Sequence, residues 1–523
     1  MESNGRTKPL WSTTATLPRF RPLPGDCSTD VVVIGAGITG ITAALLLKRA
    51  GKRVLLIEGL GVLGGETGRT TAHATQILDR RYQQLSKRLG PEDLARIAQS
   101  HADAIDFIEG LVREHQLDCG FERVPGYLYA ETAAQEAELR REFDAARSAG
   151  LDVSLSEELQ LPFEVKLAMR VERQAQFDPA RYLAPLVAQL PGDGCEVHTH
   201  TRVTDVHDGA PCQVVTDHGV IRARAVFVAT NVPINNKLFL ITKVAPYRTY
   251  ALAKRVESFP RGLYWDMEDP YHYTRVQQTP QGQFLIVGGK DHRVAEENEA
   301  SAFDGLETYV RERYGYSDFD YRWSGQVEEP ADGLALLGRN PVSRNVYVAT
   351  GFSGTGMTWG TLGALIVSDL ILGSENRYAD LYDPTRLLPA RSAKVYLSEN
   401  LDFPYHLIRD RLRSPDAREL SEVPIGEGRL IPWNGKRVAI YRDSSGTVHA
   451  MSPVCTHMGC HVQWNGAEKS WDCPCHGGRY EATGQVIHGP PVRRLAPVDL
   501  ETGEPAAEPR VGKTDGDEEL PGT

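Results

Sequence analysis

The side chains best suited to chemistry are cysteines and histidines gathered toward the C-terminal end of the chain. A Cys-x-His within residues 455–460 is followed, after 15 intervening residues, by a Cys-x-x-His within residues 473–478. Two thiolates and two imidazoles suit either a two-iron cluster, with the thiolates on one iron and the imidazoles on the other, or a tetrahedral zinc ion. Each half also carries one further cysteine and is followed by glycines, which permit tight loops. These features favour the iron–sulfur cluster.

The two loops resemble those of Rieske iron–sulfur proteins of the cytochrome bc type, and the resemblance covers roughly residues 420–500. High-potential members carry a serine where this chain has Gly478, whereas Tyr480 keeps a second hydrogen-bond donor to the cluster. Because such donors stabilise the reduced cluster, we expect an intermediate potential. The resemblance implies cluster ligands Cys455, His457, Cys473 and His476 and a disulfide bond between Cys460 and Cys475.

A second chemical signal is a glycine-rich turn between a buried strand and a helix. Residues 30–34 are rich in β-branched side chains, residues 41–50 have helical spacing, and the apolar run 54–57 precedes an acidic residue. In such a unit the glycines let the backbone approach a pyrophosphate at the helix N-terminus, and the acidic side chain binds a ribose. The residues predicted to bind a dinucleotide here are Gly35, Ala36, Gly37, Ile38, Thr39, Gly40 and Glu58.

Three further segments favour FAD over NAD. Residues 64–71 form a second glycine loop, residues 226–231 look like a later strand closing the adenine side, and residues 349–358 precede a helix at about 359–372. The last loop closely resembles that of sarcosine and γ-glutamylputrescine oxidases of the D-amino-acid oxidase (DAO) superfamily, where it faces the flavin. This resemblance spans residues 30–375 and implies FAD bound by Arg69, Thr70, Thr71, Val203, Gly351, Gly354, Thr355, Gly356 and Met357.

Sarcosine oxidases attach their flavin to a cysteine just upstream of this last loop. No cysteine lies between Gly325 and Gly356, so non-covalent FAD is expected. The same oxidases take a hydride from the carbon beside an amine nitrogen, and the resulting imine hydrolyses. By that resemblance we expect catalytic residues on the aromatic-rich strands of the middle region, with packing or surface roles as the alternative for each. The candidates are Arg248, His272, Lys290 and His292, with Arg69 and Arg275 as possible carboxylate anchors.

These motifs predict an α/β FAD-binding domain of Rossmann-like DAO type, an antiparallel α+β substrate lobe and a small all-β Rieske domain. The expected order is an N-terminal arm at 1–29, the oxidoreductase domain at 30–390, a linker at 391–419, the Rieske domain at 420–503 and a disordered tail at 504–523. Within the oxidoreductase domain, the FAD-binding part comprises about 30–90, 185–240 and 325–390, and the substrate lobe about 91–184 and 241–324.

Composition excludes several other classes of protein. With 41% hydrophobic and 24% charged residues, the chain is typical of globular proteins. Its net charge of -11 argues against a nucleic-acid partner, because phosphate attraction requires a basic surface. No apolar run approaches the roughly 20 residues that span a bilayer, and the N-terminal residues lack the apolar core of a secretion signal. We therefore expect a cytoplasmic location.

The combined motifs predict an FAD-dependent amine or amino-acid dehydrogenase. The small-molecule substrate would reduce FAD by hydride transfer, and the electrons would pass singly to the Rieske [2Fe–2S] cluster and then to an external acceptor, either a redox protein, a quinone or oxygen. Two alternatives stay open on the sequence alone. One is an oxygen-using amine oxidase with an accessory Rieske module, and the other is a redox-sensing or electron-transfer flavoprotein without small-molecule turnover.

Overall fold

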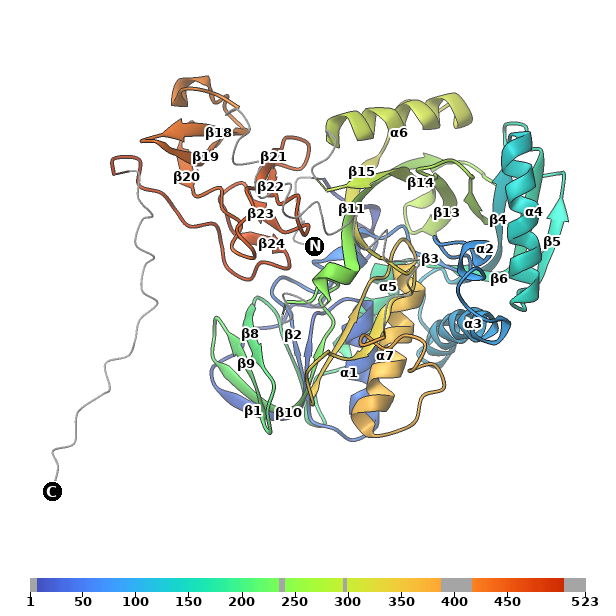
Figure 1. The fold of residues 1–523 in the computed structure, drawn as a ribbon, viewed down its shortest axis with the longest axis horizontal. Coiled ribbons are helices and arrows are strands. Elements are labelled where there is room, and N and C mark those ends of the chain that lie inside the picture. Colours follow the sequence, from blue (N-terminus) through green and yellow to red (C-terminus); the bar gives the residue numbers. More distant parts are fainter. Residues whose placement is uncertain (1–6, 235–239, 295–298, 387–415, 503–523) are drawn as a thin grey trace.

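The computed structural model describes residues 7–234, 240–294, 299–386 and 416–502. These residues form two large sheets with helices packed on them and a small all-β domain beside them (Figure 1). The predicted tail and most of the predicted linker lie outside the described residues.

The first sheet is built around β1 (Cys27–Ile34), whose last four residues are apolar and buried. Such a run suits a central parallel strand covered on both faces. It pairs in parallel with β2 (Val54–Ile57) and β10 (Val220–Val228), in the order β16-β17-β10-β1-β2-β7. The remaining members are β7 (Cys195–His198), β8 (Val203–His207), β9 (Cys212–Thr216), β16 (Leu336–Arg339) and β17 (Val346–Thr350), with α1 (Ile38–Arg49), α5 (Pro179–Ala188) and α7 (Gly356–Leu372) as the associated helices.

The second sheet is mainly antiparallel and carries the order β15-β11-β14-β13-β12-β4-β6-β3, with β5 beside β6. The antiparallel sheet predicted for the middle region is therefore present as a separate sheet. Its strands are β3 (His73–Ala74), β4 (Glu122–Ala130), β5 (Val153–Ser156), β6 (Leu167–Gln176), β11 (Val244–Val256), β12 (Leu263–Trp265), β13 (Tyr273–Thr279), β14 (Gly282–Arg293) and β15 (Tyr321–Pro330). The other helices are α2 (Tyr82–Leu85), α3 (Pro91–Glu114), α4 (Ala133–Ser148) and α6 (Glu299–Tyr314), with 3-10 turns η2 (Glu66–Arg69) and η3 (Ile241–Lys243).

The C-terminal domain consists of two small antiparallel sheets. One contains β18 (Glu427–Trp433), β19 (Lys436–Arg442) and β20 (Val448–Met451), preceded by η5 (Leu420–Glu422). The other contains β21 (Gln463–Asn465), β22 (Ser470–Asp472), β23 (Arg479–Glu481) and β24 (Val486–His488). The Cys-x-x-His at residues 473–476 therefore lies in the hairpin loop between β22 and β23.

The N-terminal arm is irregular, as expected, and several of its residues are buried. Apart from the 3-10 turn η1 (Leu10–Ser12), the described part of the arm before β1 contains no helix. Trp11 is nevertheless fully buried and donates a hydrogen bond to the Thr70 carbonyl at 2.6 Å. Prolines predict the lack of regular structure in a segment, but they do not predict whether other domains cover it.

Candidate active site and metal centre

The glycine-rich turn has the close packing that a dinucleotide site requires. A Cβ atom at Gly40 would lie 1.8 Å from the carbonyl oxygen of Gly35, so only glycine allows α1 to pack this closely. Gly35 itself has φ +111°, and a Cβ there would lie 2.5 Å from the Ala229 carbonyl oxygen. The carboxylate of Glu58 accepts a hydrogen bond from the Ala36 amide at 2.8 Å. The backbone therefore runs close to the space in which a pyrophosphate would bind.

This turn borders a cavity that extends between the two sheets and reaches the C-terminal domain. Most of the residues predicted to bind FAD line it. They are Gly35, Gly37, Ile38, Thr39, Glu58, Arg69, Thr70, Thr71, Val203, Gly354, Gly356 and Met357. The other four predicted residues lie behind this lining. Ala36 bonds to Glu58, Gly40 packs on Gly35, and Gly351 packs against Pro330. Thr355 is the residue before α7, which begins three residues earlier than predicted.

The four predicted catalytic residues do not line the cavity. His272 lies against Asp266, with Nδ1 2.8 Å from a carboxylate oxygen, and Lys290 extends along α6 beside Gly305. Arg248 and His292 pair across β11 and β14 and point to the same face, where the His292 ring contacts the Tyr250 hydroxyl at 2.9 Å. This placement does not support their predicted catalytic roles.

The immediate neighbours of these residues face the cavity instead. Thr249, Tyr271, Tyr273 and Asp291 all line it. Successive side chains of a strand point to opposite faces, so a prediction that misses by one residue selects the wrong face. The sequence prediction did not include Asp291 or Thr249. The i, i+2 spacing of Tyr271 and Tyr273 was a sequence signal that marks the cavity face.

The two arginines considered as carboxylate anchors bond to the protein. Arg69 lines the cavity, but its guanidinium donates to the Ser324 carbonyl at 2.8 Å. Arg275 is fully buried and donates to the Thr71 carbonyl at 2.5 Å and the Phe177 carbonyl at 3.1 Å. Burial lowers the pKa of Arg275 to about 9. Both guanidiniums hold backbone segments together around the cavity.

The metal-binding loops converge as predicted, and the predicted disulfide between Cys460 and Cys475 is present. Cys473 lies within 4.8 Å of both disulfide sulfurs, but only Cys455 and Cys473 remain as thiols in these loops. The rings of His457 and His476 meet edge to face with centroids 5.1 Å apart. Burial lowers the pKa of His476 to about 3, which keeps its imidazole neutral, as metal binding requires. This donor set of two thiols and two imidazoles fits a [2Fe–2S] cluster.

Gly478 has a structural reason for lacking a side chain. A Cβ at this position would lie 2.7 Å from Cδ of Pro491 and 3.7 Å from Sγ of Cys455. A serine here therefore requires Pro491 to move before its hydroxyl can donate to a sulfur. Tyr480 occupies the second donor position as predicted, because its hydroxyl donates to Cys455 Sγ at 3.2 Å.

The Tyr480→Phe variant should have a lower cluster potential than the unchanged protein. Loss of a hydrogen bond to sulfur removes a contact that favours the more negative reduced cluster. A bond worth about 1 kcal/mol corresponds to roughly 40 mV for a one-electron couple. Redox titration followed by electron paramagnetic resonance measures the shift, and an unchanged or higher potential would contradict this role of the tyrosine.

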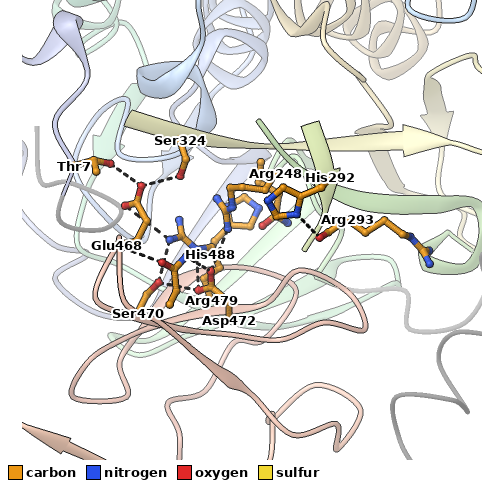
Figure 2. A network of polar contacts seen from close by, with 12 residues as sticks. Thr7, Arg248, His292, Arg293, Ser324, Glu468, Ser470, Asp472, Arg479 and His488 are labelled. Carbon is orange, nitrogen blue, oxygen red and sulfur yellow. Dashed lines mark hydrogen bonds and ion pairs between the residues drawn. The ribbon is translucent and has the colours of Figure 1, made fainter. Parts of the chain in front are cut away.

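The Rieske-like domain is joined to the flavin-type domain through a buried polar network (Figure 2). Arg479 is fully buried and contacts Asp472 at 3.1 Å and Glu468 at 4.0 Å. Glu468 in turn accepts hydrogen bonds from Thr7 at 2.7 Å and Ser324 at 2.8 Å. The N-terminal arm, β15 and the Rieske-like domain thus meet at one carboxylate.

The interface extends to both proposed cofactor sites. A Cβ at Gly477, next to His476, would lie 2.2 Å from the Gln326 side chain of β15 and 2.7 Å from Pro246 of β11. On the other side, His488 lines the cavity and its Nδ1 lies 3.4 Å from Glu66. The metal-binding loop and the cavity therefore share one wall.

Comparison with known proteins agrees with both sites. The FAD-dependent oxidoreductase (DAO) family model matches residues 30–370, and the Rieske [2Fe-2S] domain model matches residues 415–499. The chain belongs to the DAO family of FAD-dependent oxidoreductases and carries a C-terminal Rieske domain. Its cofactors are accordingly FAD and a [2Fe–2S] cluster.

Individual relatives share either the whole arrangement or the flavin part. The chain is 32% identical to YhfW of Bacillus subtilis, named as a Rieske 2Fe-2S iron-sulfur protein, over 94% of this chain and 97% of that protein. It is 24% identical to the γ-glutamylputrescine oxidoreductase of Escherichia coli, over 75% of this chain and 95% of that one. Glycine oxidase from Geobacillus kaustophilus has a similar fold, with a TM-score of 0.58 and 18% identity, over 69% of this chain and 100% of that chain. Among the described residues, no helix combines the length and apolarity of a membrane span.

Proposed function

We propose that this protein oxidises an amine or amino acid and passes the electrons, within one chain, from the flavin site to the Rieske centre and then to an external acceptor. When bound, FAD accepts the hydride of the substrate and the cluster carries single electrons onward. Under this proposal the flavin is held without a covalent bond, and the protein acts in the cytoplasm.

The shared wall between the two sites is the observation that carries this proposal. Residues 487–489 and 491–492 of the Rieske domain line the same cavity as the glycine-rich turn and the start of α7. The four groups proposed as cluster ligands, Cys455, His457, Cys473 and His476, belong to the same small domain. Hydrogen bonds from Thr7 and Ser324 to Glu468 and the buried Arg248–Asp472 ion pair at 3.5 Å hold this domain against the flavin-type domain.

Each part of the cavity wall has a separate task in this proposal. The turn at Gly35 and Gly37 and the N-terminus of α7 would hold the anionic parts of the cofactor. Thr249, Tyr271, Tyr273 and Asp291 would orient the substrate at the far end of the cavity. Thr249, Tyr273 and Asp291 lie on paired strands of the second sheet, which keeps the binding geometry rigid.

Anaerobic mixing of the purified protein with a panel of amines and amino acids tests the reaction class. At least one of these compounds should bleach the flavin absorbance, whereas NADH and NADPH should not. Bleaching by a pyridine nucleotide alone would contradict the proposal. Measurement of hydrogen peroxide in air then separates an oxygen-using oxidase from a dehydrogenase that needs another acceptor.

A further inference from the structure

We propose that the substrate is a cationic amine without an α-carboxylate, and that Asp291 binds its ammonium group. This inference rests on the proposed amine-oxidising function and narrows it to one substrate class. It is carried by the charged side chains that line the cavity. Among the described residues these include a carboxylate with one unbonded oxygen, and each lining arginine is already bonded to a backbone carbonyl.

The cavity lacks a carboxylate anchor among the residues that the structure describes. Its two lining arginines are Arg69 and Arg202. Arg69 donates to the Ser324 carbonyl, and Arg202 donates to the Val486 carbonyl at 2.9 Å. A carboxylate moved from water into this cavity would lose its hydration without gaining a bidentate partner, which is costly.

Asp291 offers the opposite charge at the substrate end of the cavity. One of its oxygens is hydrogen-bonded to Thr249, which also contacts the Tyr273 hydroxyl at 2.7 Å. Its Oδ1 atom is buried and has no hydrogen-bond partner among the described residues. The side chain as a whole keeps partial accessibility because it faces the cavity. A buried carboxylate with one unpaired oxygen is stabilised by a cation placed against it.

A second carboxylate shapes this region without competing for the ligand. Asp79 accepts hydrogen bonds from the Tyr271 hydroxyl and from the Gly354 amide, the latter at 2.7 Å, and it does not line the cavity. The hydrogen bond from Tyr271 to Asp79 holds the Tyr271 side chain in place beside Asp291. The two tyrosine rings, with centroids 6.0 Å apart, give the pocket aromatic walls, and aromatic faces also attract cations.

The chemistry balances with Asp291 as the proton acceptor. The bound ammonium ion R–CH2–NH3+ gives one proton to the carboxylate and becomes the neutral amine. A hydride, carrying two electrons, then leaves the adjacent carbon for the FAD of this family, and the substrate becomes the iminium ion R–CH=NH2+. Addition of water releases the aldehyde and an ammonium ion. The oxidant is FAD, and no other co-reactant is needed for this half-reaction.

The protonation of Asp291 gives the reaction a defined pH dependence. Burial raises the pKa of Asp291 to about 7, the hydrogen bond from Thr249 opposes the shift, and the negative charge of Asp79 adds to it. Tyr271 and Tyr273 have pKa values raised by burial and stay neutral. Because the carboxylate must be ionised and simple amines stay cationic up to about pH 10, kcat/KM should rise with pH through about 7 and then level off.

Three matched pairs of compounds test the inference: 2-phenylethylamine and phenylalanine, putrescine and ornithine, and butylamine and norvaline. Members of each pair differ only in the α-carboxylate. We expect anaerobic flavin reduction by at least one amine to be on the order of 100-fold faster than by its amino acid. Thermal-shift binding without turnover should show the same preference. Because these comparisons use the unchanged protein, they do not depend on a variant folding.

The Asp291→Asn variant tests the assigned residue, with Asp193→Asn as the matched control at a side chain that is 92% exposed. Asp291→Asn should keep its FAD, lose on the order of 100-fold in kcat/KM for the amine, and lose the rise near pH 7. Asp193→Asn should match the unchanged protein. Faster reduction by the amino acids would overturn the inference but leave the proposed function intact. No reduction by any pair or by the wider panel would overturn both.

Discussion

The Gly40→Ala variant will be purified without stoichiometric FAD. The added methyl group would lie 1.8 Å from the Gly35 carbonyl oxygen, and that atom belongs to the backbone of the turn itself. Either α1 moves away from β1 or the turn opens, and both changes remove the close approach that the pyrophosphate requires. Flavin released by denaturation and measured against protein concentration gives the occupancy. Because attachment is expected to be non-covalent, the same step tests whether flavin stays with the precipitated chain.

Gly110→Ala is the matched control for this change. Gly110 lies within α3, and a Cβ there would meet no atom within 4 Å. Replacing an exposed helical glycine by alanine stabilises a helix by up to about 1 kcal/mol. The control should therefore keep its FAD and unfold at the same or a higher temperature. Full FAD occupancy in Gly40→Ala would contradict the assignment of this turn.

The Arg479→Met variant should destabilise the Rieske domain, in which all three charged partners lie. Burial opposes ionisation of Asp472, but the positive charges of Arg479 and Arg248 hold the pKa of that carboxyl below its usual value. Removing the Arg479 guanidinium takes away the partner that Glu468 and Asp472 share within this domain, and breaking such a buried pair from one side costs about 3–5 kcal/mol. Calorimetry should show a separate unfolding transition at lower temperature, and limited proteolysis should become faster.

Arg429→Met provides the comparison within the same domain. Arg429 pairs with Glu427 at 3.6 Å, but the two side chains are 33% and 27% exposed. Pairs in contact with solvent contribute about 0–1 kcal/mol. A loss of stability of equal size in both variants would show that the buried ion pairs of Arg479 do not stabilise the Rieske domain.

Local motifs were predictable from the sequence because their geometry depends on few residues. The turn at Gly35 to Gly40 needs only a strand, a helix and small residues between them. The two cysteine and histidine loops likewise fold around their own donors and are closed by the Cys460–Cys475 disulfide. Each of these loops lies between two consecutive elements, the glycine turn between β1 and α1 and the metal-binding loops between β20 and β21 and between β22 and β23, so neighbouring sequence determines its shape.

Side-chain directions in the substrate sheet were not predictable in the same way. The register of β11 against β14 shifts between Arg248 and Tyr250, and such a shift comes from strand pairing rather than from local sequence. A one-residue difference places Asp291 in the cavity and Lys290 beside α6. The contact between Thr7 and Glu468 joins residues 461 positions apart. No local pattern indicates a pairing over that distance.

Electron transfer from substrate to cluster is the central claim, and anaerobic single-turnover reduction tests it most directly. The protein is mixed with a reactive amine without mediator, and flavin absorbance and the paramagnetic signal of the reduced cluster are followed together. The cluster should be reduced after the flavin, with a rate that does not depend on protein concentration, because both centres belong to one chain. A fully reduced flavin beside a cluster that stays oxidised, or a rate proportional to protein concentration, would contradict transfer across the shared wall.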